Sequence, residues 1–138
     1  MKINLLIVDD ESDSTLLFEQ NFQEEIASSE IELYYANSGE QALHILDLEK
    51  EQPNLVIILS DINMPGMRGV VLLKEIKHSH PNVTIFMVTD YGNYKDVILA
   101  WENGAEEIIN KPVNFDYLRN LIQDFIRAHN SKKQGEGS

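Results

Sequence analysis

The chain has 138 residues, of which 43% are hydrophobic, and this predicts one folded domain with a core of its own. Its 23 acidic residues outnumber its 11 basic residues and give a formal net charge of −12, which argues against direct binding to nucleic acid or to anionic membranes. The chain contains no cysteine, so disulfides, a thiolate nucleophile and cysteine-based zinc sites are excluded. Because we find neither a signal-peptide pattern nor a membrane-length apolar run, we expect a cytoplasmic protein.

Five short apolar runs that are rich in β-branched residues predict five strands. They cover residues 3–8, 31–36, 55–59, 83–88 and 106–109. Several are apolar almost throughout, which is typical of parallel strands that are covered on both faces. The second run alternates with polar positions, so we expect it near an edge of the sheet.

The segments after these strands carry apolar residues at helical spacing and predict five helices. The apolar stripes begin, in chain order, at Phe18, Ala42, Leu72, Val97 and Leu118. The first stripe continues through Phe22 and Ile26 as one helix, and Ser38 with Gln41 forms a capping box before the second. The fourth helix contains Trp101, which we expect in or near the core. The last helix is predicted to fade after Arg127.

This alternation of strands and helices predicts a single α/β domain over residues 1–128. Five (βα) units favour a doubly wound parallel sheet with right-handed crossovers. The polar, glycine-containing segment 129–138 is predicted to be a tail or the stub of a linker.

Polar side chains follow four of the five strands, at the sheet edge where folds of this class bind their ligands. These residues are Asp9, Asp10, Asp61, Thr89, Asp90 and Lys111. Three carboxylates in one cleft would repel each other by roughly 4 kcal/mol per pair at about 4 Å and an effective dielectric of about 20, so we expect a compensating cation. Oxygen-only ligands favour Mg²⁺. A carboxylate could then attack a phosphoryl group whose oxygens are stabilised by Lys111 and the Thr89 hydroxyl.

Each of these residues also has a structural interpretation. Asp9 and Asp10 could cap the first helix, and Asp61 could belong to the turn that follows it. Thr89 could be an ordinary strand residue, and Lys111 with Pro112 could be a common strand exit. The functional interpretation is favoured because separate strand ends deliver complementary groups to one edge.

Four segments, LLIVDDE, LSDINMPGMRG, IFMVTD and GAEEIINKPVNF, occur in this order along the chain. With them, residues 3 to about 127 resemble the CheY-like response-regulator receiver domain of two-component signalling. The resemblance implies a flavodoxin-like strand order of 2-1-3-4-5. It also implies that Asp61 accepts a phosphoryl group from the phosphohistidine of a sensor histidine kinase or a phosphotransfer protein.

The same resemblance assigns the remaining site residues. Asp10, Asp61 and the backbone carbonyl of Asn63 are implied to ligate Mg²⁺, and Asp9 to act through a bound water. Thr89 and Lys111 are implied to engage the phosphoryl group. Pro65 and Gly69 match positions that shape the loop after the phosphoacceptor, and the Lys111–Pro112 peptide bond is expected to be cis.

The sequence departs from the family pattern at three positions. The switch position, usually Tyr or Phe, is Ile108, so the usual aromatic movement is not available in its usual form. Val113 stands where Phe is frequent. Asp90 occupies a position that is usually small, and it either caps the next helix or faces the cleft as a modulator of the phosphorylated state.

The leading hypothesis is therefore a phosphorylation-controlled switch rather than a turnover enzyme. We expect its output surface on the fourth helix, fifth strand and fifth helix, where a homodimer could form, and a C-terminal output domain is a candidate partner beyond this chain. One alternative is a degenerate receiver that acts as a dimerisation module, which Ile108 favours. Another is a haloacid-dehalogenase-type phosphohydrolase, but that class needs an Asp-x-Asp motif after the first strand. A flavodoxin is disfavoured because the acidic strand ends would repel the FMN phosphate.

Overall fold

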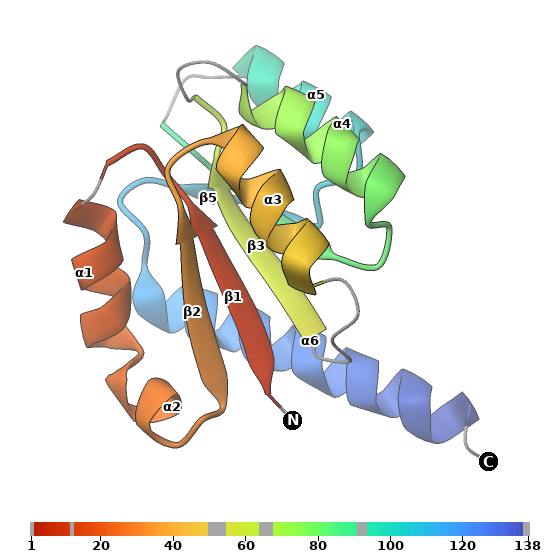
Figure 1. Ribbon diagram of the computed structural model, residues 1–138. Coiled ribbons are helices and arrows are strands. Elements are labelled where there is room, and N and C mark those ends of the chain that lie inside the picture. Colours follow the sequence, from red (N-terminus) through yellow and green to blue (C-terminus); the bar gives the residue numbers. More distant parts are fainter. Residues whose placement is uncertain (1, 12, 50–54, 64–67, 91–93, 137–138) are drawn as a thin grey trace.

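The computed structural model describes residues 2–11, 13–49, 55–63, 68–90 and 94–136. Strands and helices alternate along these residues (Figure 1). In chain order they are β1 (Ile3–Val8), α1 (Asp13–Asn21), α2 (Gln23–Ala27), β2 (Ile31–Ala36), α3 (Gly39–Glu49), β3 (Leu55–Asp61), α4 (Gly69–Ser79), β4 (Thr84–Thr89), α5 (Tyr94–Glu102), β5 (Glu107–Asn110) and α6 (Phe115–Glu136).

The five strands form one parallel sheet in the order β2-β1-β3-β4-β5, which confirms the predicted fold class and strand order. Every residue of β1 and of β4 is buried, as expected for strands with helices on both faces. The four central residues of β2 are only half-buried, and this strand lies at the edge of the sheet, as its alternating pattern predicted.

Helices cover both faces of the sheet, with α3, α4 and α5 on one side and α1, α2 and α6 on the other (Figure 1). Side chains alternate between these two sides along each strand. Leu6 of β1 therefore packs with Ile76 of α4, whereas Leu5 packs in a second cluster with Phe22 and Leu118. No helix within the described ranges is both long and apolar enough to cross a membrane.

The first predicted helix is interrupted at Phe22, and this separates α1 from α2. Phe22 is fully buried, but Ile26, the next residue of the predicted stripe, is partly exposed. Arg119 of α6 lies 5.2 Å from the centre of the Phe22 ring, bonds Glu25 at 3.1 Å and donates to the Asn21 carbonyl. Arg119 of α6 therefore donates to the backbone carbonyl of the last residue of α1, where the chain turns.

The structure agrees with the prediction at the start of α3 but not at the end of the last helix. Before α3, the Ser38 hydroxyl accepts the Gln41 amide at 3.1 Å, which confirms the Ser38 half of the predicted capping box, whereas the Gln41 side chain accepts the Asn37 amide at 2.6 Å rather than that of Ser38. The prediction that the last helix fades after Arg127 is wrong, because α6 continues to Glu136 and projects beyond the sheet (Figure 1). The apolar stripe of α6 ends before the helix does, and most of the polar residues beyond the stripe are tolerated in helices. The spacing of apolar residues alone therefore did not predict this extension of the helix. The domain boundary at residue 128 stays a prediction.

Trp101 does not lie in the core, contrary to prediction, because 49% of it is exposed. The neighbouring Ala100 is fully buried and packs against the α3–α5 side of the sheet instead. Tyr94, Ile98 and Trp101 are all exposed, and their spacing along the helix places them on one outward stripe of α5. The apolar surface of α5 thus points partly into solvent.

Candidate phosphoryl and metal site

The site residues lie where the carboxyl ends of the strands meet at one edge of the sheet. Asp9 directly follows β1, and Lys111 directly follows β5. Asp61 and Thr89 are themselves the last residues of β3 and β4, so both strands run slightly further than predicted. Parallel register aligns Asp61 with Val88, the residue before Thr89, which explains why these side chains gather at one edge.

Three carboxylates come together at this edge. Asp9, Asp10 and Asp61 each offer one oxygen within 4.8 Å of the other two. Like charges at such distances repel by roughly 3 kcal/mol per pair at an effective dielectric of about 20. Because all three donors are oxygens, the cluster fits a hard cation such as Mg²⁺.

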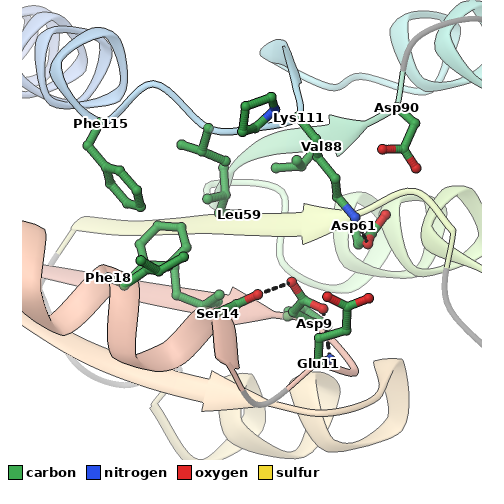
Figure 2. Close-up of a pocket in the computed structure, with 15 residues that line it drawn as sticks. Asp9, Glu11, Ser14, Phe18, Leu59, Asp61, Val88, Asp90, Lys111 and Phe115 are labelled. Atoms are coloured by element: carbon green, nitrogen blue, oxygen red, sulfur yellow. Dashed lines mark hydrogen bonds and ion pairs between the residues drawn. The ribbon is translucent and has the colours of Figure 1, made fainter.

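Asp61 is the most buried member of the group, with 6% of the residue exposed. Its Oδ1 accepts the Asn63 amide at 3.0 Å, and its Oδ2 lies 2.5 Å from Lys111 Nζ (Figure 2). Partial burial lowers the pKa of Lys111, but the hydrogen bond to Asp61 and the charges of Asp61, Asp90 and Asp9 outweigh it, so the pKa is raised. Lys111 therefore carries its positive charge at neutral pH.

Asp9 is both a member of the acidic group and an organiser of the turn into α1. Its Oδ1 accepts the Glu11 amide at 2.9 Å, and its Oδ2 accepts the Ser14 hydroxyl at 2.8 Å (Figure 2). Membership of the acidic group and capping of the first helix, the two interpretations given for Asp9, are therefore compatible. Sequence reasoning missed Ser14, although a hydroxyl in the first turn of a helix is a usual partner for an upstream carboxylate.

Gly69, the first residue of α4, allows that helix to sit directly against the end of β3. A Cβ at this position would overlap the Asp61 carbonyl oxygen and would lie 2.6 Å from the Ile62 Cα. The Gly69 amide donates to the Ile62 carbonyl at 2.9 Å, which fixes the close approach. This agrees with the loop-shaping role predicted for Gly69, whereas Pro65 lies outside the described residues.

Thr89 is buried at the end of β4, and its hydroxyl donates to the Asp90 carbonyl at 3.3 Å. Asp90 is exposed, and its side chain lines the same cavity as Asp61 and Lys111 (Figure 2). Of the two orientations predicted for the Asp90 side chain, this is the one that faces the cleft. The cap alternative involves residues 91–93, which lie outside the described ranges.

Two further expectations concern β5 and the residues after it. Ile108 is half-buried against the α3–α5 side of the core and is paired in register with Met87 of β4. The Lys111–Pro112 peptide bond is cis, as the resemblance implies. The structure therefore brings Asp9, Asp10, Asp61 and Lys111 together, whereas Ile108 packs into the core on the α3–α5 side of the sheet.

Comparisons with known proteins give a consistent result. The family model "Response regulator receiver domain" matches residues 5–123. Sporulation initiation phosphotransferase F of Bacillus subtilis is 31% identical over 126 residues, covering 91% of this chain and 95% of that protein. Regulatory protein AtoC of Escherichia coli is 29% identical over 131 residues, covering 94% of this chain but only 26% of that protein.

Solved structures show the same fold. A response regulator receiver domain protein from Clostridium thermocellum has a TM-score of 0.79 at 26% identity, covering 93% of this chain and 97% of that chain. The receiver domain of NtrX from Brucella abortus has a TM-score of 0.73 at 29% identity, covering 87% and 95%. The family model, the near full-length relative and the strand-end geometry agree, and the chain belongs to the response regulator receiver domain family.

Proposed function

We propose that the chain is a phosphorylation-controlled switch of two-component signalling in which Asp61 is the phosphoacceptor. The observation that carries this proposal is the environment of Asp61, a buried carboxylate that faces a cavity and lies 2.5 Å from the Lys111 ammonium. A carboxylate oxygen of Asp61 forms a bond to phosphorus while the bond from phosphorus to the donor's imidazole nitrogen breaks. The leaving nitrogen keeps the electron pair, and the product is an aspartyl phosphate.

The acidic group supports a Mg²⁺ site next to this nucleophile. Asp10, Asp61 and the carbonyl of Asn63 would hold the ion, and Asp9 would reach it through a water. When bound, Mg²⁺ supplies positive charge to the phosphoryl oxygens and offsets the repulsion among the carboxylates. Asp9 is held toward the cluster by Ser14, which keeps its carboxylate from turning away.

Lys111 and Thr89 supply the remaining contacts. The Lys111 ammonium, now bound to Asp61, would move part of its hydrogen bonding to the new phosphoryl oxygens. The Thr89 hydroxyl would turn from the Asp90 carbonyl toward the same oxygens. We assign the switch position to Ile108, which would respond through aliphatic packing because it has no ring to swing.

The outward surface formed by α5, β5 and α6 is the proposed output surface. Tyr94, Ile98 and Trp101 give α5 an exposed apolar stripe, which supports a protein partner or a homodimer on this face. The upstream partner would be a sensor histidine kinase or a phosphotransfer protein. The chain spans only 26% of AtoC, which supports an output domain beyond this segment, and we propose a cytoplasmic location.

The experiment is labelling by acetyl phosphate in the presence of Mg²⁺, read by intact-protein mass spectrometry. We expect the parent chain to gain one phosphoryl group and Asp61→Asn to gain none. Asp116→Asn is the matched control, because Asp116 is an exposed carboxylate on α6, and it should label like the parent. Equal labelling of Asp61→Asn and the parent would refute the assignment.

A second candidate function, a degenerate receiver that acts only as a dimerisation module, is favoured by Ile108 and by the exposed stripe of α5. It predicts association without any labelling. Sedimentation of the parent with and without acetyl phosphate separates the two functions. A switch changes its self-association or partner binding on labelling, whereas a module associates equally in both conditions.

A further inference from the structure

The turn from β1 into α1 is closed by three hydrogen bonds among Asp9, Glu11 and Ser14. Asp9 Oδ1 accepts the Glu11 amide at 2.9 Å, and Asp9 Oδ2 accepts the Ser14 hydroxyl at 2.8 Å (Figure 2). The Ser14 amide in turn donates to the Glu11 carbonyl at 3.3 Å. Each oxygen of the Asp9 carboxylate therefore already accepts a hydrogen bond, and the two bonds together fix the position and the plane of this carboxylate.

Ser14 reaches Asp9 from a helix that is held in place independently of the acidic group. It is the second residue of α1 and is half-buried. The carbonyl of the next residue, Thr15, accepts the Tyr35 hydroxyl from β2 at 3.1 Å. One turn further along α1, Phe18 is buried in the core. The position of the Ser14 hydroxyl is therefore set by the packing of α1, and this hydroxyl orients Asp9 before any ion binds.

We propose that Ser14 is a positioning residue that makes the metal site prefer Mg²⁺ to Ca²⁺. The inference rests on the metal site of the proposed function and adds the residue that sets its ion preference. Mg²⁺ retains several waters and takes about one or two carboxylates directly, whereas Ca²⁺ takes about six to eight oxygens and often binds both oxygens of one carboxylate. Because Glu11 and Ser14 engage both oxygens of Asp9, this carboxylate suits a hydrated ion better than an ion that needs chelation.

Removal of the Ser14 hydroxyl would release one oxygen of Asp9. The carboxylate would then be free to turn, and both of its oxygens would become available to one ion. Ca²⁺ gains a direct ligand from this change, whereas Mg²⁺ loses a carboxylate that is held in place for its water shell. Loss of a partner that orients a metal ligand costs roughly 10- to 100-fold in metal affinity. If Ser14 only supported the start of α1, its removal would change the affinity for both ions by the same factor or not at all.

The test is an NMR titration of the full chain with MgCl₂ and, separately, with CaCl₂, in the absence of any phosphodonor. The shifts of the Glu11 and Asn63 amide signals report binding. We expect Ser14→Ala to weaken Mg²⁺ binding at least about tenfold and to lower the ratio of Mg²⁺ affinity to Ca²⁺ affinity by a similar factor. Ser14→Thr keeps the hydroxyl and should keep the ratio of the parent. Ser28→Ala is the matched control, because it removes a hydroxyl that bonds only the Glu25 carbonyl, at 3.2 Å, just after α2, and it should bind both ions like the parent.

The possible outcomes separate this inference from the proposed function. Parent-like binding of both ions by Ser14→Ala, or an equal loss of affinity for both, would overturn the role of Ser14 alone. A Ser14→Thr variant that behaves like Ser14→Ala would overturn it as well. Alanine is a strong helix former, so we expect Ser14→Ala to fold, and Ser14→Cys, whose thiol is a weak donor, should show the same direction of change. A parent chain that binds no Mg²⁺ would overturn the metal site of the proposed function together with this inference.

Discussion

Replacing Gly69 with alanine tests how α4 positions the phosphoacceptor. The new Cβ would overlap the Asp61 carbonyl oxygen and lie 2.6 Å from the Ile62 Cα, and both contacts are with backbone that no rotamer change can move. Either α4 or the end of β3 must therefore shift. Overpacking of this kind costs roughly 1–3 kcal/mol, offset by roughly 0.5 kcal/mol from the reduced freedom of the unfolded chain. We expect Gly69→Ala to lose about 1–2 kcal/mol of unfolding free energy.

Gly104→Ala is the matched control for this substitution. Gly104 has a φ of +99°, so alanine there is strained by its backbone conformation, but its Cβ would meet only the flexible Lys77 side chain, at 3.5 Å. We expect a loss of roughly 1–2 kcal/mol in this variant as well. Urea unfolding measures the loss of unfolding free energy in both variants. Labelling by acetyl phosphate distinguishes the two variants, because only Gly69→Ala displaces Asp61. Unchanged stability of Gly69→Ala, or equal labelling of both variants at the parent rate, would refute the reasoning.

Three further predictions address the acidic group, the edge strand and the cleft. Without metal, Asp10→Asn should raise the unfolding free energy by about 1 kcal/mol, after a discount for exposure, and it should lose stabilisation by Mg²⁺. Thermal melts in chelator that show no gain would contradict a crowded acidic group. Burial and the charge of Glu19 raise the pKa of Tyr35 to about 12 from an ordinary value of 10.0. The folded state therefore holds the phenolic proton more tightly, and this stability is complete below pH 10 and lost as pH rises through 12. Unfolding free energies measured across this range should fall less steeply in Tyr35→Phe, and identical slopes would count against the prediction. Because Asp90 lines the phosphoacceptor cavity, Asp90→Ala should slow the decay of the phosphorylated form in Mg²⁺. An unchanged decay rate with reduced stability would identify Asp90 as a helix cap instead.

The sheet and its acidic edge could be predicted because their signals are local. β1 is apolar except for Asn4, and β4 is apolar between its terminal threonines, and the burial of both strands follows from this pattern. Once the strands are parallel and in register, Asp9 and Asp61 must come to the same edge. The predicted strand ends were short by up to two residues, because Asp61 and Thr89 are polar and yet remain in their strands.

The features that sequence reasoning missed depend on contacts between distant residues. The interruption at Phe22 involves Arg119, far along the chain, which no helical period reveals. Trp101 is exposed because the small Ala100 takes the buried position on α5, so residue size was a poor guide to orientation. The contact between the rings of Phe18 and Phe115 joins α1 to the start of α6, and no pattern within either helix reveals it.

The most direct test of the central claim is mass spectrometry of the parent chain and of Asp61→Asn, each incubated with acetyl phosphate with and without Mg²⁺. The account predicts one added phosphoryl group on the parent only when Mg²⁺ is present, mapped by peptide analysis to Asp61, and none on the variant. Phosphorylation of Asp61→Asn, or metal-independent labelling of the parent, would contradict a phosphoacceptor built from Asp61, Lys111 and the acidic group.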